Sequence, residues 1–143
     1  MQPGTVQRHR TEDGVNIIKQ DDRSIAKPQI FADLFASARD ESLPWQPFRQ
    51  GIEICRLYEE PGGASAAFLR YAPGARLQRH QHRGHEHILV LSGSQIDDNG
   101  EHQVGAMIIH PPGTSHTVTT TQGCVVLALW EKPVLFLPDE PQR

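Results

Sequence analysis

The sequence has few of the features that cross-link, export or membrane-anchor many small proteins. Its 143 residues include only two cysteines, Cys55 and Cys124, which lie far apart and form no CxxC pair. Free thiols are therefore expected in place of a disulfide framework. No stretch approaches the roughly 20 apolar residues of a membrane span, and the polar N-terminus does not read as a signal peptide. We expect a cytoplasmic protein without a membrane segment.

The chain has no large excess of positive or negative charge, and its composition does not favour long helices. The net charge is −3 and the basic residues are scattered, which argues against a nucleic-acid partner. Hydrophobic residues make up a modest 37%, whereas 12 glycines and 11 prolines make turns frequent. This composition favours one all-β domain of short strands over a helical bundle.

Short apolar stretches separated by turn residues begin at residue 51. Asn99-Gly100 predicts a two-residue hairpin with positive φ at both central positions. The evenly spaced stretches predict a β-sandwich or barrel. The predicted strands cover 52–58, 65–72, 75–82, 86–91, 106–110, 115–121, 124–130 and 134–137.

The regions outside these stretches are predicted to be less regular. Residues 1–50 form an N-terminal arm in this interpretation, with a flexible lead-in at 1–14, a short strand at 15–20 and a short helix at 30–38. Two prolines around Trp45 argue against regular structure over 43–48. Residues 51–137 would form the barrel, and 138–143 a polar tail.

Histidines are crowded immediately before the apolar run at 86–91. His80 and His82 are two residues apart, so both can point to one face of a strand. A hairpin-like reversal at 83–85 would bring Glu86 back over them, and His116 follows a tight turn further along the chain. Imidazoles and a carboxylate suit Zn, Fe, Mn, Ni or Cu. Taken singly, the other histidines are expected to be surface or hydrogen-bonded core residues: His9, His85, His87, His102 and His110.

These spacings resemble the two motifs of the cupin superfamily. GARLQRHQHRGHEHILVLSG fills every fixed position of the first motif from Gly74 to Gly93, and GAMIIHPPGTSHTVTT matches the second from Gly105 except that Thr120 stands at the final Asn. The resemblance implies a double-stranded β-helix (jelly-roll, RmlC-like) barrel with a short N-terminal helix. It also implies a metal site made of His80, His82, Glu86 and His116. Gly74, Gly93 and Gly113 are expected in turns with positive φ.

A closer similarity is to the cupin domain of ChrR-type anti-sigma factors. The chain shares HQHRGHEHILVLSG, the DDNG hairpin, PPGTSH and Gly123-Cys124 with that pattern. It departs from it at His85 and His87, which stand where the pattern has Gly and Glu. In that family the anti-sigma activity resides in a separate zinc-binding N-terminal domain, and residues 1–50 contain no cysteine. We therefore carry over the metal-binding barrel and not the sigma-factor partner.

The ligand set leaves two functions open. A closed four-ligand site with zinc suits a regulatory, ChrR-like cupin that senses a small molecule or redox change. Iron, manganese or nickel would keep positions open and suit a metal-dependent dioxygenase acting on a small oxygenated organic compound. A sugar-phosphate isomerase or epimerase is disfavoured because no Lys/Arg cluster would bind a phosphate.

The barrel is expected to have a mostly apolar interior able to hold a small-molecule ligand. Tyr71, Arg76 and His110 are predicted near its mouth. A homodimer is expected by resemblance, with residues 15–20 as the strand to be exchanged, since a sheet edge needs cover. The predicted barrel-facing side chains are Phe68, Leu77, Ile88, Val90, Val118, Val126 and Ala128.

Overall fold

A computed structural model describes residues 8–10, 16–18 and 26–139 of the chain, which divides into two units, residues 1–32 and 33–143. In the first unit, β1 (Arg8–Arg10) pairs antiparallel with β2 (Asn16–Ile18). β1, which carries His9, falls in the stretch expected to be a flexible lead-in. β2 lies within the predicted strand 15–20, of which residues 15, 19 and 20 are outside the described residues. So are residues 140–143 of the predicted tail.

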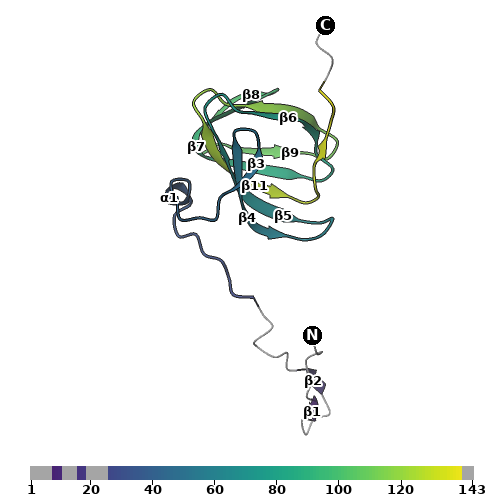
Figure 1. Cartoon of the computed structure of the whole chain (residues 1–143). Helices are drawn as coiled ribbons and strands as arrows, with labels where there is room; N and C mark the ends of the chain where they lie inside the picture. The colour runs from purple at the N-terminus through teal and green to yellow at the C-terminus, as the bar shows by residue number, and fades with distance from the viewer. Residues whose placement is uncertain (1–7, 11–15, 19–25, 140–143) are drawn as a thin grey trace. The chain divides into compact units, whose positions relative to one another are not determined.

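The second unit is a single curled antiparallel sheet with one short helix (Figure 1). Its strand order is β12-β6-β10-β7-β11-β5-β4-β3, and β8 and β9 both pair with β7. The all-β fold with a short N-terminal helix is confirmed. The described elements are α1 (Leu34–Ser37), β3 (Gln46–Arg49), β4 (Ile52–Glu59), β5 (Ser65–Tyr71), β6 (Arg76–Gln81), β7 (Glu86–Asp97), β8 (Gly100–Gln103), β9 (Met107–His110), β10 (Ser115–Thr119), β11 (Cys124–Trp130) and β12 (Leu135–Phe136).

Alternation along the strands places one apolar face inside the curl. On β4, Ile52 and Ile54 point inward, and on β5 Leu69 does so. The predicted barrel-facing residues are confirmed except Phe68, which is fully buried on the opposite face of β5 and lies beside Trp45, with ring centroids 6.5 Å apart. Sequence alternation could not decide this, because both faces of β5 are buried.

Aromatic and cationic side chains bring the two outermost strands of the sheet together. The rings of Phe48 on β3 and Phe136 on β12 have centroids 6.5 Å apart. The Arg49 guanidinium lies over both rings, 4.7 Å and 4.4 Å from their centroids. A guanidinium over an aromatic face is attractive, so this stack closes the sheet into a barrel at the level of β3 and β12.

The strand β7 bends sharply along its length. At roughly 3.3 Å per residue, the first and last Cα atoms of such a strand would lie about 36 Å apart. Instead, Glu86 at one end and Asp97 at the other both approach the ring of His116. The bend lies at Gly93, which has φ +66° and pairs with Cys124 of β11. The register with β11 shifts just before it, because Val125 pairs with Ser92 but Val126 pairs with Val90.

Three local predictions are corrected by the structure. Gly93 lies inside β7, where the bend rather than a turn requires its positive φ. The hairpin before β8 pairs Asp97 with Gly100, so its central residues are Asp98 and Asn99, and no described non-glycine residue has positive φ. Residues 46–49 form β3 in spite of Pro47, since β3 is an edge strand, where a missing N–H is tolerated.

Two further predictions concern the cysteines and a membrane span. Cys55 and Cys124 are free buried thiols, as predicted. Among the described residues, no helix has the length and apolar character needed to cross a bilayer.

Candidate metal centre

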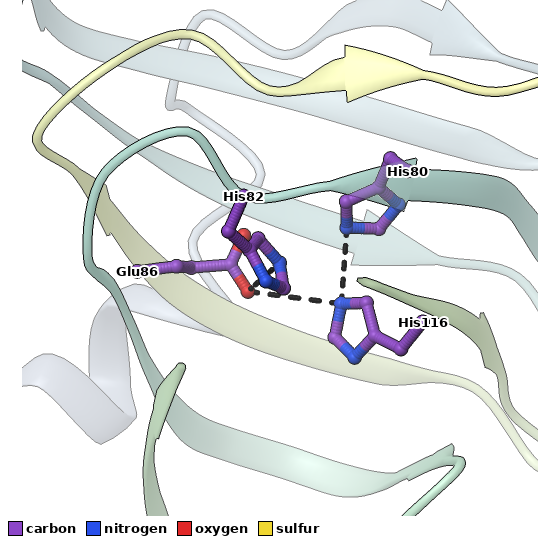
Figure 2. A group of neighbouring side chains, drawn as sticks. All are labelled: His80, His82, Glu86 and His116. Carbon is purple, nitrogen blue, oxygen red and sulfur yellow. Dashed lines mark hydrogen bonds and ion pairs between the residues drawn. The ribbon is translucent and has the colours of Figure 1, made fainter. Parts of the chain in front are cut away.

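Four buried side chains from neighbouring strands meet at one end of the barrel (Figure 2). His80 lies near the end of β6, directly opposite His116 of β10 in the strand register. His82 follows β6, and Glu86 begins β7 after the connecting turn. Each of the four residues is at most 3% exposed. The structure therefore brings together all the side chains that the two motifs indicated.

The inward-facing atoms of this cluster lack ordinary partners. His82 Nε2 is 3.1 Å from Glu86 Oε1, yet the angles make no hydrogen bond, and both atoms are buried without a partner. His116 Nε2 lies 3.0 Å from His80 Nε2 and 3.8 Å from Glu86 Oε1. One ligand atom from each of the four residues fits within a span of 4.8 Å. Buried polar atoms are rarely left unpaired in native proteins.

The outward-facing atoms, in contrast, are all held. His80 Nδ1 donates to the Gln78 carbonyl at 2.9 Å, and His116 Nδ1 donates to Asp97 Oδ2 at 3.0 Å. His82 Nδ1 donates to Thr114 Oγ1 at 3.0 Å, because the only hydrogen of that hydroxyl goes to the Pro111 carbonyl. These partners place the ring proton on Nδ1 in all three histidines and leave each Nε2 with a lone pair.

The carboxylate is oriented in the same way. Trp130 Nε1 donates to Glu86 Oε2 at 2.7 Å, which leaves Oε1 facing the imidazoles. Outer partners of this kind fix ligand orientation in metal sites. In the resulting arrangement, His80 Nε2 and His116 Nε2 lie 3.0 Å apart, each with its lone pair directed into the cluster. Glu86 Oε1 lies 3.8 Å from His116 Nε2.

The surroundings of the cluster favour neutral imidazoles and an ionised carboxylate. Burial lowers the pKa of His80 and lowers the pKa of His116 to about 4, so both rings are neutral near pH 7. Burial raises the pKa of Glu86, but the surrounding imidazoles, His82 first, outweigh it and leave that pKa below its ordinary value. Neutral imidazoles and an ionised carboxylate are the forms that bind divalent metals.

One further histidine joins the cluster. His110 is 5% exposed, and its ring stacks on His82 with centroids 4.8 Å apart. Its Nε2 has no hydrogen-bond partner and lies 3.8 Å from Glu86 Oε1 and 3.7 Å from Asp97 Oδ2. The expectation that His110 is an ordinary hydrogen-bonded or surface histidine is therefore wrong. Its pairing opposite Glu86 across β7 and β9 could not be read from the motif.

The other histidines and polar candidates lie outside the cluster. His85 is exposed and bonds Glu131, and His102 bonds Asp97, as expected of surface or hydrogen-bonded histidines. Arg76 is exposed and pairs with Asp139. Tyr71 is buried inside the barrel.

Thr120, which stands at the last position of the second motif, has a structural contact instead of a place in the cluster. Its hydroxyl donates to the Ser94 carbonyl at 2.8 Å and accepts from Gly123 N at 3.0 Å. These bonds tie the bend of β7 to the turn before β11.

Two spaces of different size lie next to the cluster. A cavity of about 30 Å³ is bordered by His80, Glu86 and His116, and it has room for one or two water molecules. A wider pocket of about 200 Å³ lies beside it and shares Phe48, Trp130, Val134 and Phe136 with it. The two spaces adjoin at these shared side chains, and none of the four proposed ligand residues lines the larger one.

Comparisons with known proteins agree with this architecture. A family model described as the ChrR cupin-like domain matches residues 35–133. The anti-sigma-E factor ChrR of Cereibacter sphaeroides is 30% identical over 112 residues, which are 76% of this chain and 51% of that protein. The chain thus spans about half the length of that curated relative.

Solved structures give the same result. Rhodobacter sphaeroides SigE in complex with the anti-sigma ChrR matches with TM-score 0.60 and 27% identity, covering 68% of this chain and 54% of that one. An acetylacetone dioxygenase from Acinetobacter johnsonii matches with TM-score 0.67 and 14% identity, covering 88% of both chains. The second similarity concerns the fold alone.

Proposed function

The chain is a member of the ChrR cupin-like domain family, and from that premise we propose that it binds one divalent transition-metal ion through His80, His82, Glu86 and His116. We propose further that the metal-loaded barrel is a regulatory module that senses a small molecule or a redox change. The observation that carries the metal proposal is the 3.0 Å contact between His80 Nε2 and His116 Nε2. Two facing lone pairs in a buried site repel each other unless a cation lies between or beside them.

The donor set fits zinc first. Three neutral imidazoles and one carboxylate can complete a tetrahedron around Zn²⁺, and iron, manganese or nickel would use the same donors. When bound, the ion would supply a Lewis acid next to the small cavity. The chain's own contribution is to orient the donors through Gln78, Thr114, Asp97 and Trp130.

The size of the cavity supports a regulatory rather than a catalytic role. Pockets for organic ligands usually measure about 300–1,000 Å³, whereas the space bordering the ligand atoms is about 30 Å³. The relative named as an anti-sigma-E factor is a regulator. We do not extend its sigma-factor partner to this chain, which covers about half of that protein. We also propose that the protein is cytoplasmic and forms a homodimer.

A metal-dependent dioxygenase is the second candidate. The wider pocket of about 200 Å³ next to the aromatic side chains could admit a small oxygenated compound if those side chains moved. This candidate requires iron, manganese or nickel and a measurable turnover with O₂.

One set of measurements tests both candidates. Elemental analysis of the purified protein should find one divalent metal per chain, with zinc expected. His82→Ala should abolish binding, whereas His85→Ala, which alters an exposed histidine outside the cluster, should retain it. A metal content that is the same in both variants would refute the site. Steady O₂ consumption by the iron-loaded protein with a β-diketone such as acetylacetone, lost in His82→Ala, would replace the regulatory proposal with the catalytic one.

A further inference from the structure

Two polar side chains are buried in the otherwise apolar barrel interior below the proposed metal ligands. Gln95 on β7 is 2% exposed and Tyr71 on β5 is 3% exposed. Gln95 acts on the pKa of the Tyr71 hydroxyl, so the two side chains are neighbours, and Gln95 Oε1 has no hydrogen-bond partner. Leaving a buried amide oxygen unpaired is unfavourable, because the lost hydrogen bonds to water are not replaced. A polar pair at this depth therefore calls for a partner that the chain itself does not provide.

The small cavity joins this pair to the metal cluster. Gln95 and Tyr71 border the same space of about 30 Å³ as His80, Glu86 and His116. Its remaining walls are apolar except for Trp130, whose N–H is already used by Glu86. His82 is not among the lining residues, so the cavity meets the ligand cluster on the side away from it.

We propose that Gln95 and Tyr71 hold one hydroxylic molecule of one or two heavy atoms beside the metal, with water as the resting occupant. The proposal rests on the metal site proposed above and adds that this site is open to an external ligand rather than closed by four protein ligands. Because Gln95 Oε1 is an acceptor, its partner must donate a hydrogen, which selects O–H molecules over purely accepting anions. The volume excludes larger compounds.

Tyr71 completes the binding pair as a neutral phenol. Burial, together with the nearby Cys124 and Glu86, raises the pKa of Tyr71 well above its ordinary value. The hydroxyl therefore keeps its hydrogen and can both donate and accept. An amide oxygen, an amide N–H and a phenol then surround the occupant with both kinds of hydrogen-bonding group.

Cobalt substitution tests this inference without relying on any activity. Co²⁺ has intense visible d–d absorption when four-coordinate and weaker absorption when a further ligand is bound. The Co²⁺-loaded wild type should show the weaker bands. Gln95→Leu and Tyr71→Phe should still bind Co²⁺ but shift toward the intense four-coordinate spectrum. Gln46→Leu, the same chemical change at an exposed position of β3, should leave the spectrum unchanged.

The outcomes separate the two proposals. An intense four-coordinate spectrum in the wild type, or unchanged weak bands in both variants at full metal loading, would overturn this inference and leave the metal site intact. Failure of the wild-type chain to bind Co²⁺ would overturn the metal site and this inference with it. If Gln95→Leu does not fold, Tyr71→Phe decides, because it removes one hydroxyl and keeps the ring.

Discussion

Replacing Gly93 with alanine tests how closely the bend of β7 packs against the turn before β11. Gly93 has φ +66°, and a Cβ there would lie well under 3.0 Å from the Gly123 carbonyl oxygen. That oxygen belongs to the backbone, so no flexible side chain can move aside to make room. The added methyl group must therefore shift β7 or the turn before β11.

The expected loss of stability has two parts. An L-residue in left-handed backbone costs about 1–2 kcal/mol. Forcing a methyl group into a packed backbone contact costs about a further 1–3 kcal/mol. Domains of this kind are stable by only about 5–15 kcal/mol in total, so Gly93→Ala should remove a large share of the free energy of unfolding.

Gly62 offers a matched control. Its φ is +65°, and a Cβ there would meet nothing within 4 Å. Gly62→Ala should therefore show only the backbone cost, and the difference between the two variants isolates the crowding at the bend. Urea unfolding followed by circular dichroism measures both. Equal losses in the two variants would refute the account of the bend.

Three further predictions concern Trp130, the two cysteines and Ile109. Trp130→Phe removes the hydrogen bond that orients Glu86 and should weaken metal binding by about 10–100-fold in a competition assay with a chromophoric chelator. Cys55 and Cys124 are buried, and burial raises the pKa of Cys55 and raises that of Cys124 to about 12; at pH 8 neither thiol should react with a disulfide reagent until the protein is unfolded. Met107 and Ile109 are 58% and 54% exposed at alternate positions of β9. Neighbouring exposed apolar side chains are typical of protein interfaces, so Ile109→Asp should convert the proposed homodimer to a monomer in light scattering.

Each of these has a result that contradicts it. Trp45→Phe, whose indole bonds Asp40 at an exposed position, should leave metal affinity unchanged, and equal effects of the two tryptophan changes would remove the role of Trp130. Rapid thiol labelling of the folded protein would show that the cysteines are accessible. A monomeric mass for the wild-type chain would contradict the proposed homodimer.

The four central side chains could be predicted because their geometry is local. His80 and His82 share a face by strand alternation, and the turn at 83–85 returns Glu86 to them within a few residues. His116 needed the second motif, whose spacing after the Pro111 turn places it opposite His80. Local spacing and motif together were therefore sufficient for the cluster, although the identity of the ion depends on details that they do not contain.

The surrounding contacts could not be predicted, because they depend on how the sheet curls. Trp130 lies 44 residues from Glu86 along the chain, and Thr114 lies 32 residues from His82. Asp97 reaches His116 only because β7 bends at Gly93. The edge position of β3, which makes Pro47 acceptable, likewise follows from the order of strands in the finished sheet.

The two ends of β7 hold opposite nitrogens of one imidazole, with Glu86 near Nε2 and Asp97 bonded to Nδ1 of His116. The circumference of the barrel and the orientation of this ring therefore cannot change independently. A partner that tightened or relaxed the barrel from outside would alter the affinity for the proposed ion, and release of that proposed ion would in turn accelerate amide hydrogen exchange along β7. Such reciprocity is what a protein needs to convert chemistry at a buried point into a change of shape at its surface.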